Sequence, residues 1–321
     1  MNIKRVLPII GLAIFVYLIF KIGPKNIINS ITNVNVFLLI ISVLIIIPTI
    51  LMQTLKWFVL LKKQQIKISF KETLRLQVMS MFYGIITPAR IGSFIKIAYI
   101  KDKAKTFGKS MSSVVIDRAL DTIVISIMAL IGVIVILGEK SSFMNIAIFL
   151  GILLVLFIAL LEKRISRPFL KFIYKRLLPE KLKKGAKKGF NDFYKSMPRK
   201  RFLIWPFLLN VISWVLVYTQ TYFIALALGI KISYLYFIIL LPISTVIALI
   251  PITVSGLGTR EASLVALFSL FGIPAAKVFA MSILSIVLAD LIPSIIGFFL
   301  SLKMEIKPKD KTEIKNKDKS K

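Results

Sequence analysis

The chain has 321 residues, of which 57% are hydrophobic, and its formal net charge is +30. A soluble domain averages about 45–50% apolar residues, so this composition indicates a polytopic, all-α membrane protein. Cysteine and histidine are both absent, which excludes disulfides, thiolate metal sites, a cysteine nucleophile and histidine-based triads. We expect no cofactor and no metal site. An enzyme is less expected but not excluded, since carboxylates with a divalent ion could still act.

Uncharged runs bounded by lysine or arginine mark the expected spans, because about 20 apolar residues cross a bilayer as a helix. The first run, Val6–Phe20, lacks a small-residue cleavage site, so it is kept as a span and not taken as a signal peptide. The other spans are predicted at Asn26–Leu55, Thr122–Gly138 with a backward extension through Asp117, Ser141–Leu161, Phe202–Ile230 and Val278–Leu302.

Basic residues orient these spans. Four segments are rich in Lys and Arg. Lys56–Arg75 contains six of them, Lys101–Lys109 four, Glu162–Arg201 fifteen, and the tail after Leu302 eight. The positive-inside rule places all four segments and both termini on the cytoplasmic side of the cell membrane. Loops of this kind face anionic lipid, so we expect no nucleic acid partner.

Two segments then begin and end on the same side of the membrane. Arg75 and Lys101 share the inner side, whereas Lys231 and Lys277 share the outer side. We predict six full spans plus two broken or re-entrant hairpins that enter from opposite faces. This resembles the inverted repeats of transporters, which bind substrate at mid-membrane. Ordinary pairs of tilted spans are the alternative.

Each hairpin contains a break with an arginine, in T-P-A-R-I-G (Thr87–Gly92) and P-I-T-V-S-G-L-G-T-R-E (Pro251–Glu261). An arginine inside a bilayer costs roughly 3 kcal/mol on insertion scales. Free backbone N–H groups, a helix dipole and a guanidinium together form an anion site, and the obvious membrane anion is a lipid headgroup phosphate. The candidate binding residues are Arg90, Arg260, Thr87, Gly92, Gly256, Gly258 and Thr259.

The local chemistry predicts how each break is built. Thr87 caps a helix whose first position is Pro88. Gly256 and Gly258 allow a tight turn, and Thr259 caps the next helix. As the alternative to a binding site, Arg90 and Arg260 pair with internal carboxylates and only hold the hairpins together.

Asp290 lies thirteen residues from both Lys277 and Lys303, near the bilayer centre. A partner is expected among Arg90, Lys96 and Arg260. The pair acts either as a proton or ion relay or as a static contact. The residues proposed for gating or ion coupling are Asp290, Glu261, Asp117, Asp121, Arg118 and Lys96.

Asp117 and Asp121 are four residues apart and share a helix face, with Arg118 beside them. They line a cytoplasmic vestibule, dock against Arg90 or Lys96, or together hold a divalent cation. Further along, Arg164–Leu178 alternates basic and apolar residues as a membrane-surface helix does. The tail 303–321 is expected to be disordered, which leaves 1–302 as one membrane domain.

Three motifs carry a family resemblance: T-P-A-R-I-G-S (Thr87–Ser93), D-R-A-L-D (Asp117–Asp121) and I-P-I-T-V-S-G-L-G-T-R-E-A (Ile250–Ala262). With them the chain resembles the transmembrane region of lysylphosphatidylglycerol synthases and the stand-alone UPF0104 membrane proteins. The resemblance implies a flippase-like fold that moves lipids or lipid-linked groups. Family members usually carry an acidic residue where this chain has Ser93. The synthases' soluble aminoacyl-transferase domain is missing, so tRNA is not an expected partner.

The leading hypothesis is a translocator of anionic or isoprenoid-phosphate lipids. The chain has no G-x-x-x-x-G-K-[ST] motif for ATP, so transfer would be passive or ion-coupled. One alternative is a membrane-embedded transferase or hydrolase of lipid phosphates that uses Asp117 or Asp121. The other is a membrane partner of a separate soluble enzyme.

Overall fold

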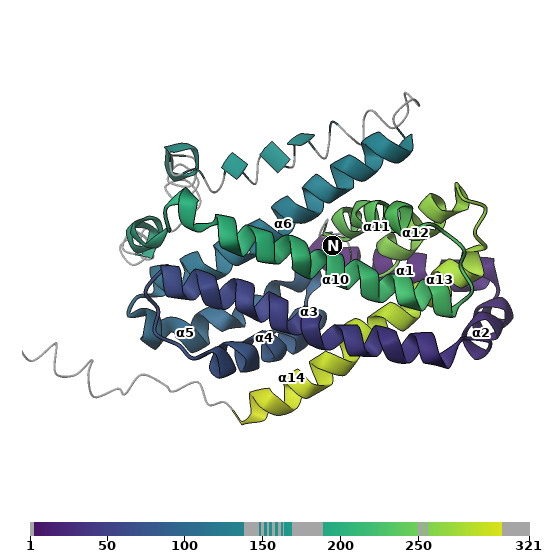
Figure 1. The fold of residues 1–321 in the computed structure, drawn as a ribbon, viewed down its shortest axis with the longest axis horizontal. Helices are drawn as coiled ribbons and strands as arrows, with labels where there is room; N and C mark the ends of the chain where they lie inside the picture. Colours follow the sequence, from purple (N-terminus) through teal and green to yellow (C-terminus); the bar gives the residue numbers. More distant parts are fainter. Residues whose placement is uncertain are drawn as a thin grey trace, which may run out of the picture.

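Helices form every regular element in the part of the chain that the computed structural model describes. That part comprises residues 3–137, 189–249, 253 and 256–303, with short pieces at 148, 151–152, 154–155, 158–159, 162 and 164–168. The predicted all-helical membrane bundle is confirmed, and Figure 1 shows its long helices crossing one another.

Within these residues, four helical segments are long and apolar enough to cross a bilayer. They are α3 (Val36–Lys63), α6 (Phe107–Leu137), α10 (Ile204–Ala227) preceded by η2 (Lys200–Phe202), and the continuous run of α13 (Ala275–Ser285), η4 (Ile286–Leu291) and α14 (Ile292–Leu302). The spans expected at 122–138, 202–230 and 278–302 are therefore confirmed as long helices.

The span predicted at Asn26–Leu55 is confirmed only from Val36 on, and its start is wrong, because residues 26–32 belong to a separate short helix. Helices α1 (Ile3–Ile22) and α2 (Pro24–Thr32) are bent by 81° at Gly23, whose φ of 92° is left-handed. Helix α3 starts only after Asn35, whose side chain accepts a hydrogen bond from a backbone N–H in its first turn. The pair α1–α2 thus forms either one broken span or a re-entrant loop.

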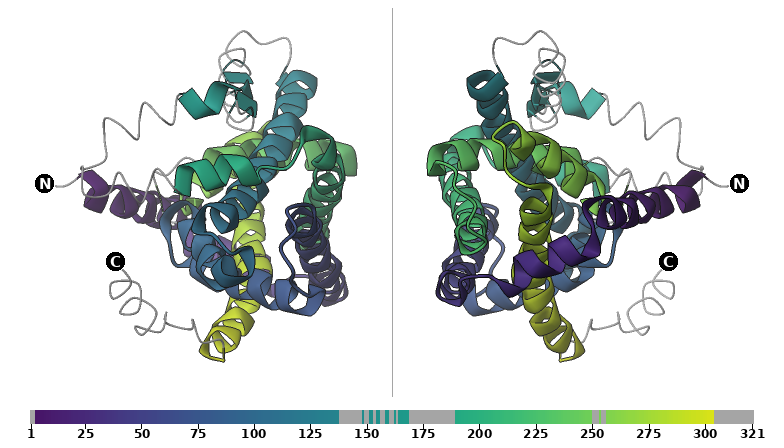
Figure 2. Two further views of the ribbon diagram at one scale, coloured as in Figure 1. Left: turned by 90° about the vertical axis from the view of Figure 1, so that its left-hand side faces the viewer. Right: turned by 90° about the vertical axis from the view of Figure 1, so that its right-hand side faces the viewer.

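Helices α3 and α10 pack against each other along much of their length (Figure 1). Their outward faces expose large apolar side chains, including Phe37 and Ile47 of α3 and Trp205 of α10. Soluble monomers rarely carry apolar surface of this extent, whereas lipid chains cover it in a bilayer. In both end-on views of Figure 2, the yellow run that ends in α14 lies between this pair and α1.

The first predicted hairpin consists of short helices: α4 (Phe70–Ile85), the 3₁₀ helix η1 (Pro88–Ile95) and α5 (Lys96–Ala104). Each is shorter than the roughly 20 residues that cross a bilayer. Helix α4 packs closely on α14, where a Cβ added at Gly297 would come within 2.4 Å of the carbonyl oxygen of Val78. Glycine at this crossing holds η4 and α14 beside the first break.

The second hairpin consists of α11 (Tyr234–Leu249) and α12 (Thr259–Ser269), which are also short. Helix α11 packs on α6 at Gly132, where a Cβ would lie 2.0 Å from the carbonyl oxygen of Ile239. Helix α12 contacts both α1 and α13. The helices of each hairpin therefore pack against longer helices of the bundle. Which face of the membrane each hairpin enters stays a prediction.

Several expectations fall largely outside the described residues. They are the span Ser141–Leu161 apart from a few of its residues, the basic helix beyond residue 168, and the tail from residue 304. Residues 164–168 are helical, as predicted for the start of the basic helix.

Candidate functional site

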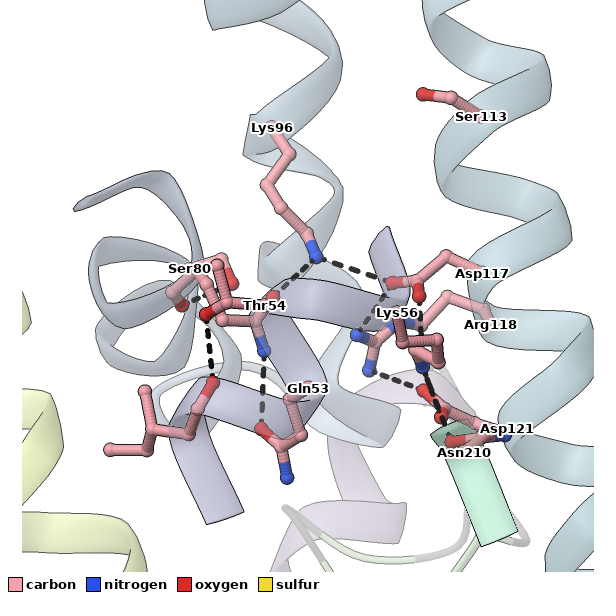
Figure 3. Close-up of polar contacts among 12 residues, drawn as sticks. Gln53, Thr54, Lys56, Ser80, Lys96, Ser113, Asp117, Arg118, Asp121 and Asn210 are labelled. Carbon is pink, nitrogen blue, oxygen red and sulfur yellow. Dashed lines mark hydrogen bonds and ion pairs between the residues drawn. The ribbon is translucent and has the colours of Figure 1, made fainter. Parts of the chain in front are cut away.

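A cluster of buried charges joins α3, α5 and α6 (Figure 3). The ammonium of Lys56 lies 2.8 Å from Oδ1 of Asp117 and 2.6 Å from Oδ1 of Asp121. The side chains of Lys56 and Asp117 are only 3% and 1% exposed. The sequence analysis placed Lys56 at the start of a cytoplasmic loop, which is wrong. Helix α3 continues to Lys63, so Lys56 lies within this helix, and its side chain points into the bundle.

Lys96 meets the same carboxylate from α5. Its ammonium lies 3.3 Å from Oδ2 of Asp117, donates to Oε1 of Gln77 at 3.0 Å, and sits 4.2 Å from the ring centre of Trp57. Gln77 in turn donates to Oε1 of Gln53 at 3.2 Å. The expected docking of Asp117 against Lys96 is confirmed. The carboxylate, the amide and the aromatic ring together solvate a cation that is fully buried.

Arg118 closes the cluster. Its Nη2 lies 3.1 Å from Asp117 and its Nη1 3.3 Å from Asp121, and its side chain is 32% exposed. Three cations thus face two carboxylates, which leaves one uncompensated positive charge among the described residues. Two buried donors have no partner there, Nε of Arg118 and Nδ2 of Asn210.

This geometry bears on the role predicted for the carboxylates. Both Asp117 and Asp121 are already bound by cations, and the described residues contain no group of three or more metal-ligating side chains. Adding a divalent ion beside three cations would be electrostatically unfavourable. The arrangement therefore favours packing anchors over a metal site.

The first break is a close turn around Thr87. Its backbone is extended and Pro88 follows at the first position of η1, as predicted. The threonine hydroxyl donates to the carbonyl of Tyr83 at 2.9 Å and accepts from the N–H of Gly92 at 2.7 Å. A Cβ at Gly92 would lie 1.9 Å from the Tyr83 carbonyl oxygen, so only glycine fits. The helix that follows is 3₁₀ and not α, which the sequence analysis did not anticipate.

Arg90 lies at the centre of this break with a left-handed φ of 55°. Its Nη2 donates to both carboxylate oxygens of Asp290 at 2.9 Å. The expected partner of Asp290 is therefore Arg90, and not Lys96 or Arg260. These contacts use one of the three guanidinium nitrogens of Arg90, and its side chain remains 48% exposed.

The backbone around Asp290 is a π-helix, η4, between α13 and α14. Pro293 lies at the start of α14. Proline has no N–H to donate to the preceding turn, so the helix is loosened where Asp290 projects. A π-helical turn inside a span is often found at functional positions.

In the second break, Gly256 and Gly258 have φ values of 80° and 84°, as expected of a tight turn. A Cβ at Gly258 would lie 2.2 Å from the carbonyl oxygen of Gly11, so the turn packs directly on α1. Thr259 was predicted to cap α12, which is wrong. Gly258 holds the cap position, since its N–H is bound by Glu261, and Thr259 is the first helical residue.

Glu261 is fully buried and joins two elements. Its Oε2 accepts from the N–H of Gly258 at 2.6 Å, and its Oε1 accepts from the hydroxyl of Ser282 in α13 at 2.7 Å. Arg260 is half-buried beside it. The described residues supply no ion-pair partner for Arg260.

One helical run therefore contacts both breaks. Ser282 of α13 binds Glu261 of the second break, and Asp290 of η4 binds Arg90 of the first. Eight residues separate them, which is about 12 Å along a helix. No contact between Arg90 and Arg260 themselves is found among the described residues.

Some residues of the site were not anticipated from the sequence. Lys56, Gln77 and Asn210 all contribute to the buried charge cluster. A usable signal exists for Lys56. Gln53 and Lys56 are three residues apart, so on a continuous helix they share a face, and a polar face in an apolar span points inward.

Comparison with known proteins agrees with this architecture. Residues 8–297 match the family model of the lysylphosphatidylglycerol synthase TM region. A UPF0104 membrane protein of Pyrococcus horikoshii is 24% identical over 94% of this chain and 97% of its own length. Another from Methanocaldococcus jannaschii is 26% identical over 95% of this chain and 97% of its own.

The position after the R-I-G of the first break, Ser93, is buried and its hydroxyl has no partner among the described residues. From the near-complete match, the chain belongs to the family of the lysylphosphatidylglycerol synthase transmembrane region, as a multi-pass membrane protein.

Proposed function

We propose that this protein translocates an anionic lipid or lipid-linked intermediate across the membrane, with the headgroup phosphate bound at the two breaks. The observation that carries the proposal is Arg90. A guanidinium within a broken membrane hairpin is 48% exposed although it is ion-paired. A charge placed only to hold helices together would be expected to be covered.

The contacts of Arg90 leave room for a ligand. Asp290 occupies Nη2 alone, so Nε and Nη1 retain donors for a phosphate. Arginine binds phosphate through two parallel N–H groups, which a single carboxylate on one nitrogen does not prevent. Asp290 then acts as a resident counter-ion that orients the guanidinium in the absence of lipid.

The run α13–η4–α14 is suited to link the two breaks. It touches Glu261 through Ser282 and Arg90 through Asp290. A headgroup that competes with Asp290 for Arg90 would change the contacts of the π-helical turn, which lies eight residues from the contact with the second break. Binding at one break is thereby communicated to the other through one helix.

The test uses purified protein in liposomes that contain a labelled anionic phospholipid, with label followed between leaflets. We expect Arg90→Gln, Arg260→Gln and Asp290→Asn each to slow transfer at least about tenfold, the loss equivalent to one charge-assisted contact. Arg75→Gln is the matched control, because Arg75 is an exposed arginine on α4 outside the break. Normal transfer by folded Arg90→Gln protein would rule out the proposed site.

A further inference from the structure

A basic pocket lies away from both breaks and from the buried charge cluster. Its volume is about 480 Å³, within the range of roughly 300–1,000 Å³ typical of small-molecule sites. The lining residues are Arg164, Arg167, Pro168, Asn191, Tyr194 and Lys195. None of them belongs to the residues assigned to headgroup binding.

The two walls of the pocket are fixed to each other. One wall is the helical turn 164–168, and the other is the helical stretch 189–196. The hydroxyl of Tyr194 donates to that of Ser166 at 3.0 Å, which donates to the carbonyl of Glu162 at 3.0 Å. Tyr194 and Ser166 are both buried. The buried hydrogen bond between Tyr194 and Ser166 thus fixes the distance between the two walls of the pocket.

The pocket lies level with the polar end of a membrane span. Gln64, the residue after α3, donates from Nε2 to the carbonyl of Ser196 at 3.2 Å. Phe193 and Tyr194 pack into the same apolar cluster as Trp57 of α3. The stretch 189–196 is therefore anchored where α3 leaves its apolar segment, which is the depth of lipid headgroups.

The charge of the lining is of one sign. Arg164, Arg167 and Lys195 are exposed, and none of the described lining residues is a carboxylate. The nearby Glu162 is engaged by Lys200 and by the backbone N–H of Arg164. The hydrogen bond from Lys200 lowers the pKa of Glu162 below its ordinary value, so this carboxylate stays ionised and paired. Three cations therefore face the cavity without an acidic partner among the described residues.

We propose that this pocket binds a phosphate group, as a second anion site separate from the breaks. Two guanidinium groups on one wall and an ammonium on the other match the oxygens of a phosphate, and the amide of Asn191 adds a further hydrogen-bonding group. A lipid headgroup and a soluble phosphate share this chemistry. The site does not depend on translocation, since it requires only binding.

The experiment titrates full-length protein in detergent micelles with three probes: dihexanoyl phosphatidylglycerol, glycerol phosphate and inorganic phosphate. Arg164→Gln/Arg167→Gln should weaken the binding of the preferred probe about tenfold or more. Lys195→Gln, on the opposite wall, should weaken it independently. Arg199→Gln/Arg201→Gln removes the same charge from exposed residues outside the pocket, so it should change the affinity little.

The arms separate the sources of the phosphate. Binding of the lipid probe without displacement by inorganic phosphate identifies a headgroup site, and displacement by inorganic phosphate identifies a site for the phosphate alone. If both double variants weaken the binding of the probe equally, the affinity depends on general surface charge, and the proposal is overturned. Failure of the wild-type protein to bind any probe would overturn it as well. Leaflet transfer by Arg90→Gln, measured separately, tests the breaks and not this pocket.

Discussion

Replacing Asp117 by asparagine should destabilise the protein more than replacing its partner Lys56 by methionine. Asp117 is the shared partner of three cations, at 2.8 Å from Lys56, 3.3 Å from Lys96 and 3.1 Å from Arg118. The wild-type cluster has three cations and two carboxylates, a net charge of +1. Asp117→Asn leaves three cations and one carboxylate, a net charge of +2 in a buried site.

Breaking a buried ion pair from one side costs about 3–5 kcal/mol, because an uncompensated charge is left behind. Asp117→Asn falls in that class. Lys56→Met leaves two cations and two carboxylates, and both carboxylates keep a cationic partner, so we expect only about 1–2 kcal/mol. The double variant restores a net charge of +1 and should lose less stability than the sum of the two single changes.

The assay is equilibrium unfolding in mixed micelles, with increasing denaturing detergent and helicity followed by circular dichroism. The free energy of unfolding is compared for the wild type, both single variants and the double variant. The charge argument is refuted if Asp117→Asn costs no more than Lys56→Met. It also fails if the two effects are additive, since coupled charges in contact must show an interaction energy.

Two further predictions concern the breaks. Gly92→Ala places a methyl group 1.9 Å from the Tyr83 carbonyl oxygen and should cost about 2–3 kcal/mol in the same unfolding assay, whereas Gly189→Ala, with its nearest neighbour at 4.0 Å, should be neutral. Glu261→Gln removes the charge from two buried hydrogen bonds and should cost about 1–3 kcal/mol, with faster amide exchange in the first turn of α12 as the local readout. If Gly92→Ala leaves the free energy of unfolding unchanged, the packing described for the first break is contradicted. If Glu261→Gln leaves amide exchange in α12 unchanged, the packing described for the second break is contradicted.

The long helices could be predicted from the sequence because length and apolar composition alone determine a span. The turn at residues 33–35 could not, since the uncharged run Asn26–Leu55 continues through it, whereas the bend at Gly23 lies between Lys21 and Lys25, where one predicted run ends and the next begins. Lys56 was misassigned for a related reason. Its charge ended an apolar run, but the compensating carboxylates lie more than sixty residues away in α6 and are brought close only by the fold.

The breaks show the same division between local and long-range information. The motif around Thr87 and Pro88 specified the cap position and the first helical position, which are decided within a few residues, although the Thr87 side chain makes no capping hydrogen bond. The sequence did not show that Gly258, and not Thr259, holds the cap position of α12. The Gly258 N–H donates to the buried Glu261, and Ser282 of α13 donates to the same carboxylate, so this arrangement depends on distant packing. That Asp290 needs a cation followed from its depth, but the choice of Arg90 depended on how α4 packs against α14.

Exposure separates two kinds of membrane-buried cation in this chain. Lys56 and Lys96 are 3% and 0% exposed, and each has carboxylate and amide partners, as expected of cations that hold helices together. Arg90 has a carboxylate partner as well, yet almost half of its side chain is uncovered. A bilayer penalises an uncovered charge more than a covered one, and Arg90 is less covered than the two lysines or than Arg118, which is 32% exposed, so its uncovered nitrogens favour an anion or water as a further partner. The first break is for this reason the better place than the lysine cluster to seek a bound headgroup.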